Sequence, residues 1–305
     1  MAIEWGEYMA SAVISAAIIG GDERQLYMAE HLSQNGLAPV LYGFDCCRAR
    51  AGEYFCDDLE TAVCGADMVI LPIPVSRDGV TLNAPYSGGE IALGGLLHMI
   101  RPAQTVFAGM MRAEHRSSLF QKGVRVYDYA DRDEFTVRNA VPTAEGVVEL
   151  AIRMRPATVN GSSAAVVGYG KTGKAVAKAL GALGACVTVA ARKCGSVYEA
   201  ENDGHCGMYT KDLSRRAGDF DILVNTVPAL VIDACVLRSL RPDCLILEIA
   251  SAPYGIDMNA AKALGLDVVI AGSLPGKTAP KTAGIIISET ILNITELLGD
   301  NGEQV

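Results

Sequence analysis

Short apolar runs alternate with amphipathic segments along the first half of the chain. Runs rich in Val, Ile, Leu and Ala predict β-strands at 12–19, 39–43, 68–71, 104–108 and 124–127. Between them, a helical spacing of apolar residues predicts helices at 23–35, 58–64, 90–99 and 114–122. Strands that alternate with helices are typical of a parallel α/β sheet. The first half therefore predicts a doubly wound domain of about five strands.

The second half repeats this alternation. Apolar runs predict strands at 164–167, 185–190, 221–225, 244–248 and 268–271, and helices at 144–154, 233–240 and 283–298. Pro142 and Thr143 indicate a domain crossover, with the Thr143 hydroxyl capping a helix that begins at Ala144 and carries Glu145 in its first turn. We therefore expect an α/β fold with two doubly wound, Rossmann-like domains, 1–142 and 143–305, with parallel sheets and a cleft between them. The last helix is expected to return to the first domain.

A glycine-rich turn follows the strand at 164–167. Gly168 permits a tight turn, Gly170 lets the backbone approach a pyrophosphate, and Gly173 allows close helix packing. The following helix offers unpaired N–H groups and the positive end of its dipole to phosphates. The turn thus predicts a dinucleotide site that comprises Gly168, Tyr169, Gly170, Lys171, Thr172 and Gly173.

The end of the next strand indicates which dinucleotide is bound. The acid that would bind a ribose 2′-hydroxyl is absent there, and Arg192 and Lys193 follow the strand instead. Two cations without a carboxylate favour a 2′-phosphate, and hence NADP over NAD. The alternative is a solvated pair of surface cations.

Further loops follow the predicted strands and could bind cofactor or substrate. For the cofactor these are Asn225, Thr226, Val227, Pro228, Ala250 and Ser251. For a substrate they are Ser76, Arg77, Tyr86 and Ser87 in the first domain, and Lys277, Thr278 and Lys281 in a rigid Pro- and Gly-rich loop at 272–284. Gly20-Gly21-Asp22 is only a fragment of a dinucleotide turn, and Asp22 would repel a phosphate. We therefore expect the first domain to serve the substrate.

Composition excludes several classes of function. At 305 residues, half of them apolar, the chain can form two globular domains. A net charge of −9 argues against a nucleic-acid partner, and no apolar run is long enough to cross a membrane. Residues 1–8 lack the basic region of a signal peptide, and the nine cysteines are scattered without metal-binding spacing, which predicts a cytoplasmic protein and no metal.

Several motifs occur together in a characteristic order: Gly20-Gly-Asp-Glu-Arg-Gln25, Tyr42-Gly-Phe-Asp45, Pro142-Thr-Ala-Glu-Gly146, Gly168-Tyr-Gly-Lys-Thr-Gly173, Asn225-Thr-Val-Pro-Ala229 and Leu274-Pro-Gly-Lys-Thr-Ala-Pro-Lys-Thr-Ala-Gly284. In this combination the chain resembles the A-subunit of dipicolinate synthase from spore-forming bacteria over nearly its whole length. The resemblance implies an NADP-dependent oxidation of a dihydrodipicolinate-type ring to dipicolinate for sporulation. It also implies a flavoprotein-like B-subunit as partner.

On this interpretation the substrate is a small dicarboxylate. Candidates to hold its carboxylates are Arg77, Ser76, Lys277 and Thr278, while the base is left open among Lys281, Glu145 and Tyr86. The cofactor loops are also similar to those of methylenetetrahydrofolate and shikimate dehydrogenases. Another two-domain NADP-dependent dehydrogenase, or a non-catalytic NADP-binding regulatory protein, therefore stays an alternative, and formation of a homo-oligomer is left open.

Overall fold

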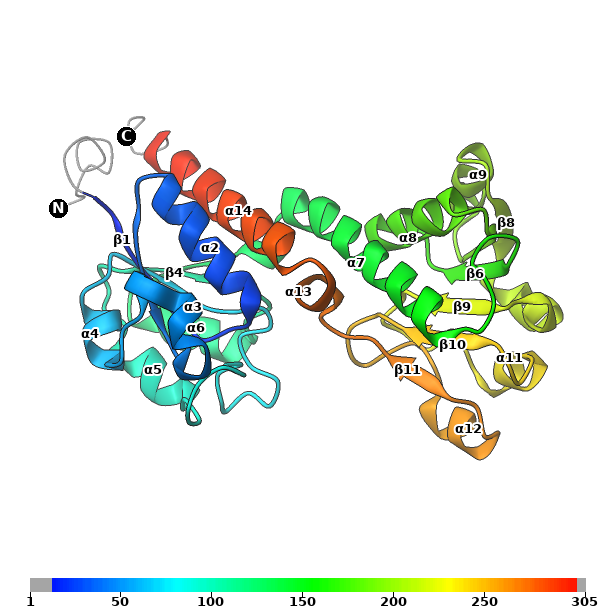
Figure 1. The fold of residues 1–305 in the computed structure, drawn as a ribbon, viewed down its shortest axis with the longest axis horizontal. Coiled ribbons are helices and arrows are strands. Elements are labelled where there is room, and N and C mark those ends of the chain that lie inside the picture. Colours follow the sequence, from blue (N-terminus) through cyan, green and yellow to red (C-terminus); the bar gives the residue numbers. More distant parts are fainter. Residues whose placement is uncertain (1–12, 301–305) are drawn as a thin grey trace. The chain divides into compact units, whose positions relative to one another are not determined.

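The computed structural model describes residues 13–300, which fold into two compact units (Figure 1). Within these residues, the first unit takes 13–136 and 280–300, and the second takes Val137–Ala279. Each unit is built on one parallel sheet flanked by helices, so the predicted class of two Rossmann-like domains is confirmed. No helix of this part of the chain is long and apolar enough to span a bilayer.

The first unit has five parallel strands in the order β2-β1-β3-β4-β5. The strands are β1 (Ser15–Ile19), β2 (Ala38–Tyr42), β3 (Met68–Ile70), β4 (Thr105–Ala108) and β5 (Arg125–Asp128). The helices are α2 (Glu23–Gln34), α3 (Arg48–Ala51), α4 (Leu59–Cys64), α5 (Leu93–Met99), α6 (Ala113–Gln121) and α14 (Pro280–Asp300). Each predicted strand is present, although the first is expected from Ala12, which lies outside the described residues.

Alternate side chains of the first sheet enter separate apolar cores on its two faces. Ala16 and Ile18 pack with α2 and α14, whereas Ala17 and Ile19 pack with α4, α5 and α6. This alternation is the period-two pattern of a strand that is covered on both sides.

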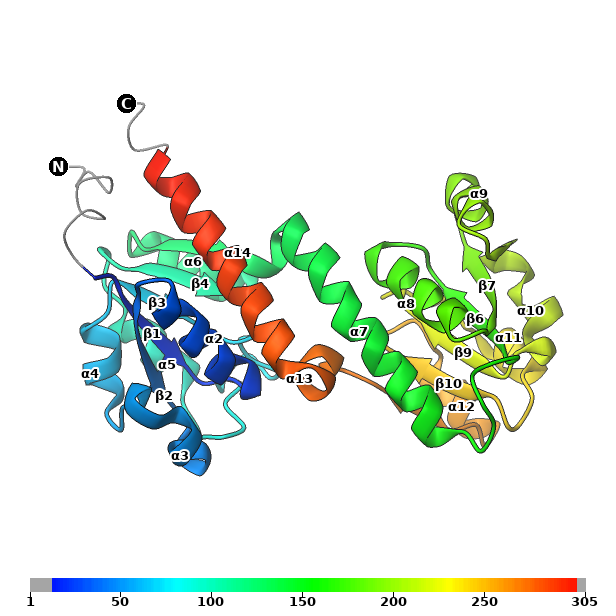
Figure 2. The ribbon, with the colours of Figure 1, turned by 45° about the horizontal axis from the view of Figure 1, so that its top comes forward.

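The C-terminal helix α14 packs along α2, as the sequence predicts (Figure 2). Ile287 and Ile291 are buried in the core that contains Leu32 of α2. A Cβ at Gly284 would collide with the backbone carbonyl of Arg24, so glycine lets the two helices approach at backbone distance. The chain therefore completes its first unit only with its last helix.

The second unit has six parallel strands in the order β11-β10-β9-β6-β7-β8. They are β6 (Ser163–Val167), β7 (Cys186–Ala191), β8 (Cys206–Tyr209), β9 (Ile222–Asn225), β10 (Leu245–Glu248) and β11 (Val268–Ile270). The helices of this part are α7 (Asp133–Met154), which begins in the first unit, α8 (Lys171–Ala182), α9 (Cys194–Asn202), α10 (Leu213–Arg216), α11 (Ala234–Ser239), α12 (Met258–Ala263) and α13 (Leu274–Thr278). This strand order is that of dinucleotide-binding domains. The sequence does not predict β8, α9 or α12.

The crossover expected at Pro142 and Thr143 is wrong. Helix α7 runs without a break from Asp133, and Pro142 lies inside it. Thr143 does not cap a helix: its hydroxyl donates to the carbonyl of Asn139, four residues earlier, a bond that a threonine within a helix can make. The units divide between Thr136 and Val137, six residues before the boundary expected at 142, and residues 280–300 join the first unit.

The segment 272–284 is also not the rigid loop that its prolines and glycines suggest. It forms α13 and the start of α14, which begins at Pro280 instead of Ala283. Each proline lies in the first turn of its helix, where its missing N–H costs nothing and its fixed φ favours the helical backbone.

An aspartate fixes the strand at which each sheet reverses its order. Asp67 accepts hydrogen bonds from the backbone and hydroxyl of Ser15 (both 2.8 Å), joining the start of β3 to β1. In the same way, Asp221 accepts from the backbone N–H of Ser163 (2.8 Å), joining the start of β9 to β6. Because open α/β sheets bind ligands at the carboxyl ends of these strands, both aspartates align the edge that carries the functional loops.

Candidate cofactor site

The glycine turn after β6 has the geometry of a dinucleotide turn. Gly168 has φ +96°, and a Cβ there would lie 2.7 Å from the side chain of Val227. A Cβ at Gly173 would collide with the carbonyl of Gly168, so α8 packs directly on the turn. By contrast, a Cβ at Gly170 would meet nothing within 4 Å. The backbone is therefore crowded at the first and third glycines and open at the second, where a pyrophosphate would approach.

The N-termini of the corresponding helices differ in the two units. Asp22 caps α2 and accepts from the N–H of Arg24, while Gln25 completes a capping box. No side chain caps α8, which begins after Gly170. The unpaired N–H groups of α8 can thus bind an anion, whereas a carboxylate occupies the same position in the first unit.

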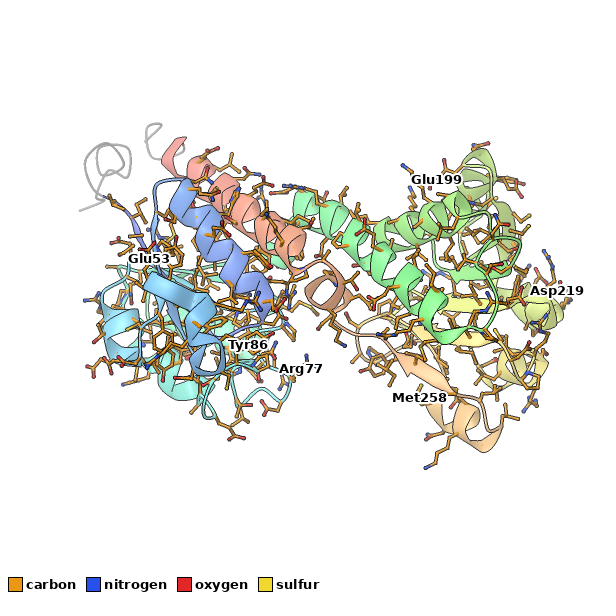
Figure 3. All side chains as sticks on the ribbon, viewed as in Figure 1. Glu53, Arg77, Tyr86, Glu199, Asp219 and Met258 are labelled. Atoms are coloured by element: carbon orange, nitrogen blue, oxygen red, sulfur yellow. The ribbon has the colours of Figure 1, made fainter. Side chains whose placement is uncertain are left out.

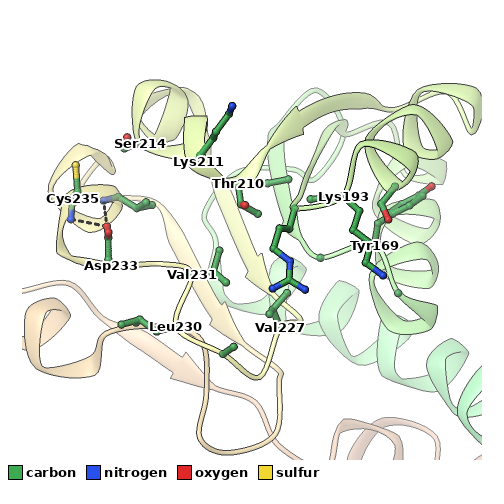
Figure 4. A pocket seen from close by; sticks show the side chains of 18 residues that line it. Tyr169, Lys193, Thr210, Lys211, Ser214, Val227, Leu230, Val231, Asp233 and Cys235 are labelled. Carbon is green, nitrogen blue, oxygen red and sulfur yellow. Dashed lines mark hydrogen bonds between the residues drawn. The ribbon is translucent and has the colours of Figure 1, made fainter.

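A cavity of about 840 Å³ opens beside this turn, and we call it the Gly168 cavity (Figure 4). Its apolar wall contains Val227, Leu230 and Val231, and its polar wall contains Lys193, Thr210 and Lys211, as Figure 4 shows. The other lining residues are Gly168, Tyr169, Gly170, Ala190, Ala191, Arg192, Ser196, Ser214, Ala229, Asp233, Cys235 and Val236. One polar and one apolar wall suit a ligand that combines phosphates with an aromatic ring.

Charged groups in the Gly168 cavity are mainly cations. Arg192 and Lys193 follow directly after β7 and line the cavity, as the sequence predicts for a phosphate site. The one lining carboxylate, Asp233, caps α11 by accepting from the N–H groups of Cys235 (2.9 Å) and Val236 (3.0 Å). The lining residues Ser196, Thr210, Lys211 and Ser214 escape the sequence analysis because the sequence pattern does not predict β8.

Tyr169 also lines the cavity, but its hydroxyl is directed elsewhere. It donates to Asp203 at 2.6 Å. Burial, followed by the nearby Asp203 carboxylate, raises the pKa of this phenol far above its usual range. Tyr169 therefore contributes ring surface and backbone to the turn, whereas Lys171 and Thr172 lie in the first turn of α8 outside the lining.

Asn225 holds the cofactor loops from inside the fold. It is fully buried, and its amide donates to both carboxylate oxygens of Glu248 (2.8 and 2.9 Å). Glu248 also accepts from the N–H groups of Ala250, Gly255 and Ile256 at 2.9–3.1 Å. Asn225 thus positions the loops after β9 and β10.

The neighbouring loop residues divide between the cavity and the fold. Thr226 donates its hydroxyl to the carbonyl of Val167 (2.8 Å), and only Val227 of this loop's predicted residues lines the cavity. Pro228, Ala250 and Ser251 lie on the loops outside the lining. The turn, the cation pair and Val227 are therefore the predicted cofactor residues that the structure brings together.

The substrate candidates of the first unit lie between β3 and α5 (Figure 3). The Ser76 hydroxyl donates to Asp78 (2.9 Å), and the Arg77 Nε lies 3.5 Å from the amide oxygen of Asn83. Hydrogen bonds led by that from the Thr81 N–H hold the pKa of Asp78 well below its usual range. Ser76 is thus already bound to an ionised carboxylate, whereas the exposed Arg77 guanidinium is more available to a ligand.

Tyr86 and Ser87 lie on the same connection. Tyr86 packs at a tilt on Phe44, with ring centres 6.3 Å apart, and burial raises the pKa of its phenol. Ser87 lies in a turn in which its N–H donates to the carbonyl of Ala84 (3.1 Å). The structure therefore places all four predicted substrate residues of this unit on one connection, although Ser76 and Tyr86 have partners within the unit.

The candidates on α7 and α13 lie on adjoining helices of the second unit. A Cβ at Gly146 would meet Leu274 at 2.8 Å, so α7 and α13 pack closely. The Thr278 hydroxyl donates to Glu149 of α7 (2.9 Å) and is committed to this packing. Glu145 and Lys277 are exposed on the same two helices, and Lys281 is exposed on α14, in the first unit.

Comparison with known proteins agrees with this arrangement. Residues 15–130 match the model of the N-terminal domain of the dipicolinate synthase A-subunit, and residues 158–286 match that of the acetohydroxy acid isomeroreductase NADPH-binding domain. The dipicolinate synthase A-subunit of Bacillus subtilis is 33% identical over 294 residues, which are 95% of this chain and 99% of that protein. The chain belongs to the dipicolinate synthase A-subunit family.

Solved structures of the same family have the same fold. The dipicolinate synthase A-subunit from Bacillus halodurans matches with a TM-score of 0.83 at 28% identity, covering 92% of this chain and 97% of that one. The structure of its Bacillus subtilis counterpart matches with a TM-score of 0.81 at 30% identity, covering 96% and 98%. The L-alanine dehydrogenase fold is similar, with a TM-score of 0.65 at 13% identity over 93% and 90% of the two chains.

Membership of the dipicolinate synthase A-subunit family and the NADPH-binding-domain match together support an NAD(P)-dependent oxidoreductase role. The family name also marks the chain as one member of a multi-subunit complex.

Proposed function

We propose that this chain is the NADP-dependent subunit of a dipicolinate synthase, and that it oxidises dihydrodipicolinate, or its hydroxylated precursor, to dipicolinate. The observation that carries the cofactor assignment is the position of Arg192 and Lys193 at the Gly168 cavity, where an NAD site would have a carboxylate. The substrate is inferred from the family, whose curated relative is named for dipicolinate synthesis.

The residues beside the glycine turn fit a dinucleotide. The open backbone at Gly170 and the uncapped N-terminus of α8 would hold the pyrophosphate, and Arg192 with Lys193 would hold the 2′-phosphate. When bound, the nicotinamide would supply the hydride acceptor. The chain itself then has to orient the ring and remove a proton.

We assign the substrate carboxylates to cations on the chain. Arg77 and Lys277 are exposed, and neither is paired with a carboxylate among the residues that the structure describes. Ser76, Tyr86, Ser87 and Thr278 would add hydrogen bonds, although Ser76 and Thr278 would first have to leave Asp78 and Glu149. The proton acceptor is one of Lys281, Glu145 and Tyr86, with Lys277 as a further catalytic candidate.

We also propose a flavoprotein-like B-subunit as partner and the cytoplasm as the location. The reaction is tested with purified chain, NADP and freshly made dihydrodipicolinate, with and without the B-subunit, by following NADPH absorbance. Formation of NADPH and dipicolinate in either preparation is expected. Tight NADPH binding without turnover in both preparations would instead favour a non-catalytic regulatory role, and turnover only with an amino acid or a folate would favour another dehydrogenase.

The cofactor assignment is tested by Arg192→Ala. Loss of a charge-assisted contact should weaken NADPH binding by about 1–3 kcal/mol and leave NADH binding nearly unchanged. Calorimetric titration of both nucleotides measures the difference. Arg238→Ala is the matched control, because Arg238 is exposed on α11 outside the cavity lining. Equal weakening of both nucleotides by Arg192→Ala would contradict the 2′-phosphate assignment.

A further inference from the structure

The Gly168 cavity has a second basic segment that the dinucleotide motif does not contain. Strand β8 pairs in parallel with β7, and Ala191 is the register partner of Tyr209. The residues that follow these two therefore leave the sheet edge side by side. Arg192 and Lys193 follow β7, while Thr210 and Lys211 follow β8, and all four line the cavity.

The cations on these two segments have no protein counterions. None of Arg192, Lys193 and Lys211 forms an ion pair with a carboxylate within residues 13–300. The nearest acid in sequence, Asp212, accepts instead from Arg215 at 2.8 Å. Three like charges around one cavity repel one another, so binding of an anion there relieves an unfavourable interaction.

The hydroxyl groups of the same wall are uncommitted. Ser196, Thr210 and Ser214 line the cavity, and in the described part of the chain none of their side chains forms a hydrogen bond with another residue. Uncommitted hydroxyls beside cations are the groups that bind phosphate oxygens. A phosphate monoester carries nearly two negative charges, so a single arginine neutralises only part of it.

We propose that Lys211 is a specificity-determining residue, which acts with Arg192 to select a dinucleotide that carries a phosphate on its adenosine ribose. This inference rests on the proposed NADP-dependent function and adds a residue from a different strand. The Lys211 ammonium lies at the rim of the cavity, 5.2 Å from the centre of the Tyr209 ring (Figure 4). Its flexible four-carbon stem lets the ammonium move toward a bound phosphate.

The test compares the binding of NADPH and NADH to Lys211→Ala in the full-length chain. The variant is expected to lose about tenfold in NADPH affinity, the scale of one charge-assisted contact, and to keep its NADH affinity. Lys262→Ala removes the same charge from α12, outside the cavity lining, and should change neither affinity. Lys211→Arg should retain most of the preference for NADPH.

Each outcome has a separate meaning. If the unmodified chain prefers NADPH and Lys211→Ala keeps that preference, the role of Lys211 is refuted while the cofactor assignment stands. If Lys211→Ala weakens both nucleotides equally, Lys211 contacts a part that they share and does not determine specificity. If the unmodified chain binds both nucleotides equally, the cofactor assignment fails, and this inference fails with it.

Discussion

Charged residues of the second unit either bind within the fold or face the cavity. Glu248 is almost fully buried and accepts hydrogen bonds from Asn225 and from three backbone N–H groups. Arg192 and Lys211 instead line the cavity without counterions in the described chain. A sequence motif can locate Arg192 because it directly follows the second strand of the glycine turn. Lys211 has no such motif, since its position depends on pairing between β7 and β8.

Replacing the buried carboxylate should destabilise the second unit. Glu248→Gln puts an amide NH₂ group among N–H donors, so we expect a loss of about 2–4 kcal/mol in the free energy of unfolding. Urea denaturation measures this loss. Glu199→Gln is the control: Glu199 is exposed and pairs with Lys174, and its change should stay within about 0.5 kcal/mol. Equal stability of the two variants would show that the buried network contributes little.

At the scale of elements, the hydrophobic pattern predicts both sheets, but it misses features that depend on tertiary structure. Strand β8, Cys-Gly-Met-Tyr, is short, contains glycine and is only partly buried, so its pattern is weak. Pro142 suggests a boundary because proline removes a helical hydrogen bond. Tertiary packing of α7, which buries Val147 and Ala151, outweighs that local preference.

Two glycines of the dinucleotide turn should respond differently to the same added methyl group. Gly173→Ala forces a Cβ against the carbonyl of Gly168, and we expect it to cost about 1–3 kcal/mol of stability. Gly170→Ala places its Cβ in open space at φ −83°, so the fold should persist while NADPH binding weakens. Thermal denaturation and nucleotide titration separate the two effects. Unchanged NADPH affinity in Gly170→Ala would argue against a pyrophosphate at this turn.

The strand link made by Asp221 predicts a pH dependence. Hydrogen bonding from the Ser163 N–H, and then Arg241, lowers the pKa of Asp221 in the folded state. The resulting stabilisation is therefore present above the unfolded pKa of about 3.9 and is lost as pH falls through the lower folded pKa. Urea denaturation between about pH 5 and pH 2 should show a shallower loss of stability in Asp221→Asn than in the unmodified chain. Parallel pH profiles would exclude this role for Asp221.

At the scale of the whole molecule, the two units share an architecture but differ in their glycine turns. In the first unit, Asp22 caps α2, and a Cβ at Gly20 would lie 2.7 Å from Leu82. In the second unit, the turn borders the Gly168 cavity. The sequence could predict this difference from Asp22, but not that the connection between β3 and α5 folds over the first turn.

This asymmetry predicts that nucleotide protects only one unit. NADPH should slow amide hydrogen exchange at 168–173, 192–196 and 210–214, because ligand binding stabilises the segments that it contacts. The segment 20–25 should exchange at the same rate with and without NADPH. Mass-spectrometric hydrogen exchange on the full chain measures both regions, and protection at 20–25 alone would reverse the assignment of the units.

The late addition of α14 has a consequence for how the gene can be divided. The second unit is continuous, from Val137 to Ala279, whereas the first is assembled from segments on both sides of it. In architectural terms, the chain is a host domain with a guest domain inserted before its final helix. A fragment that ends near residue 142 would leave uncovered the face of α2 that Ile287 and Ile291 help to bury. The smallest complete host therefore joins residues up to 136 directly to the helix that begins at Pro280.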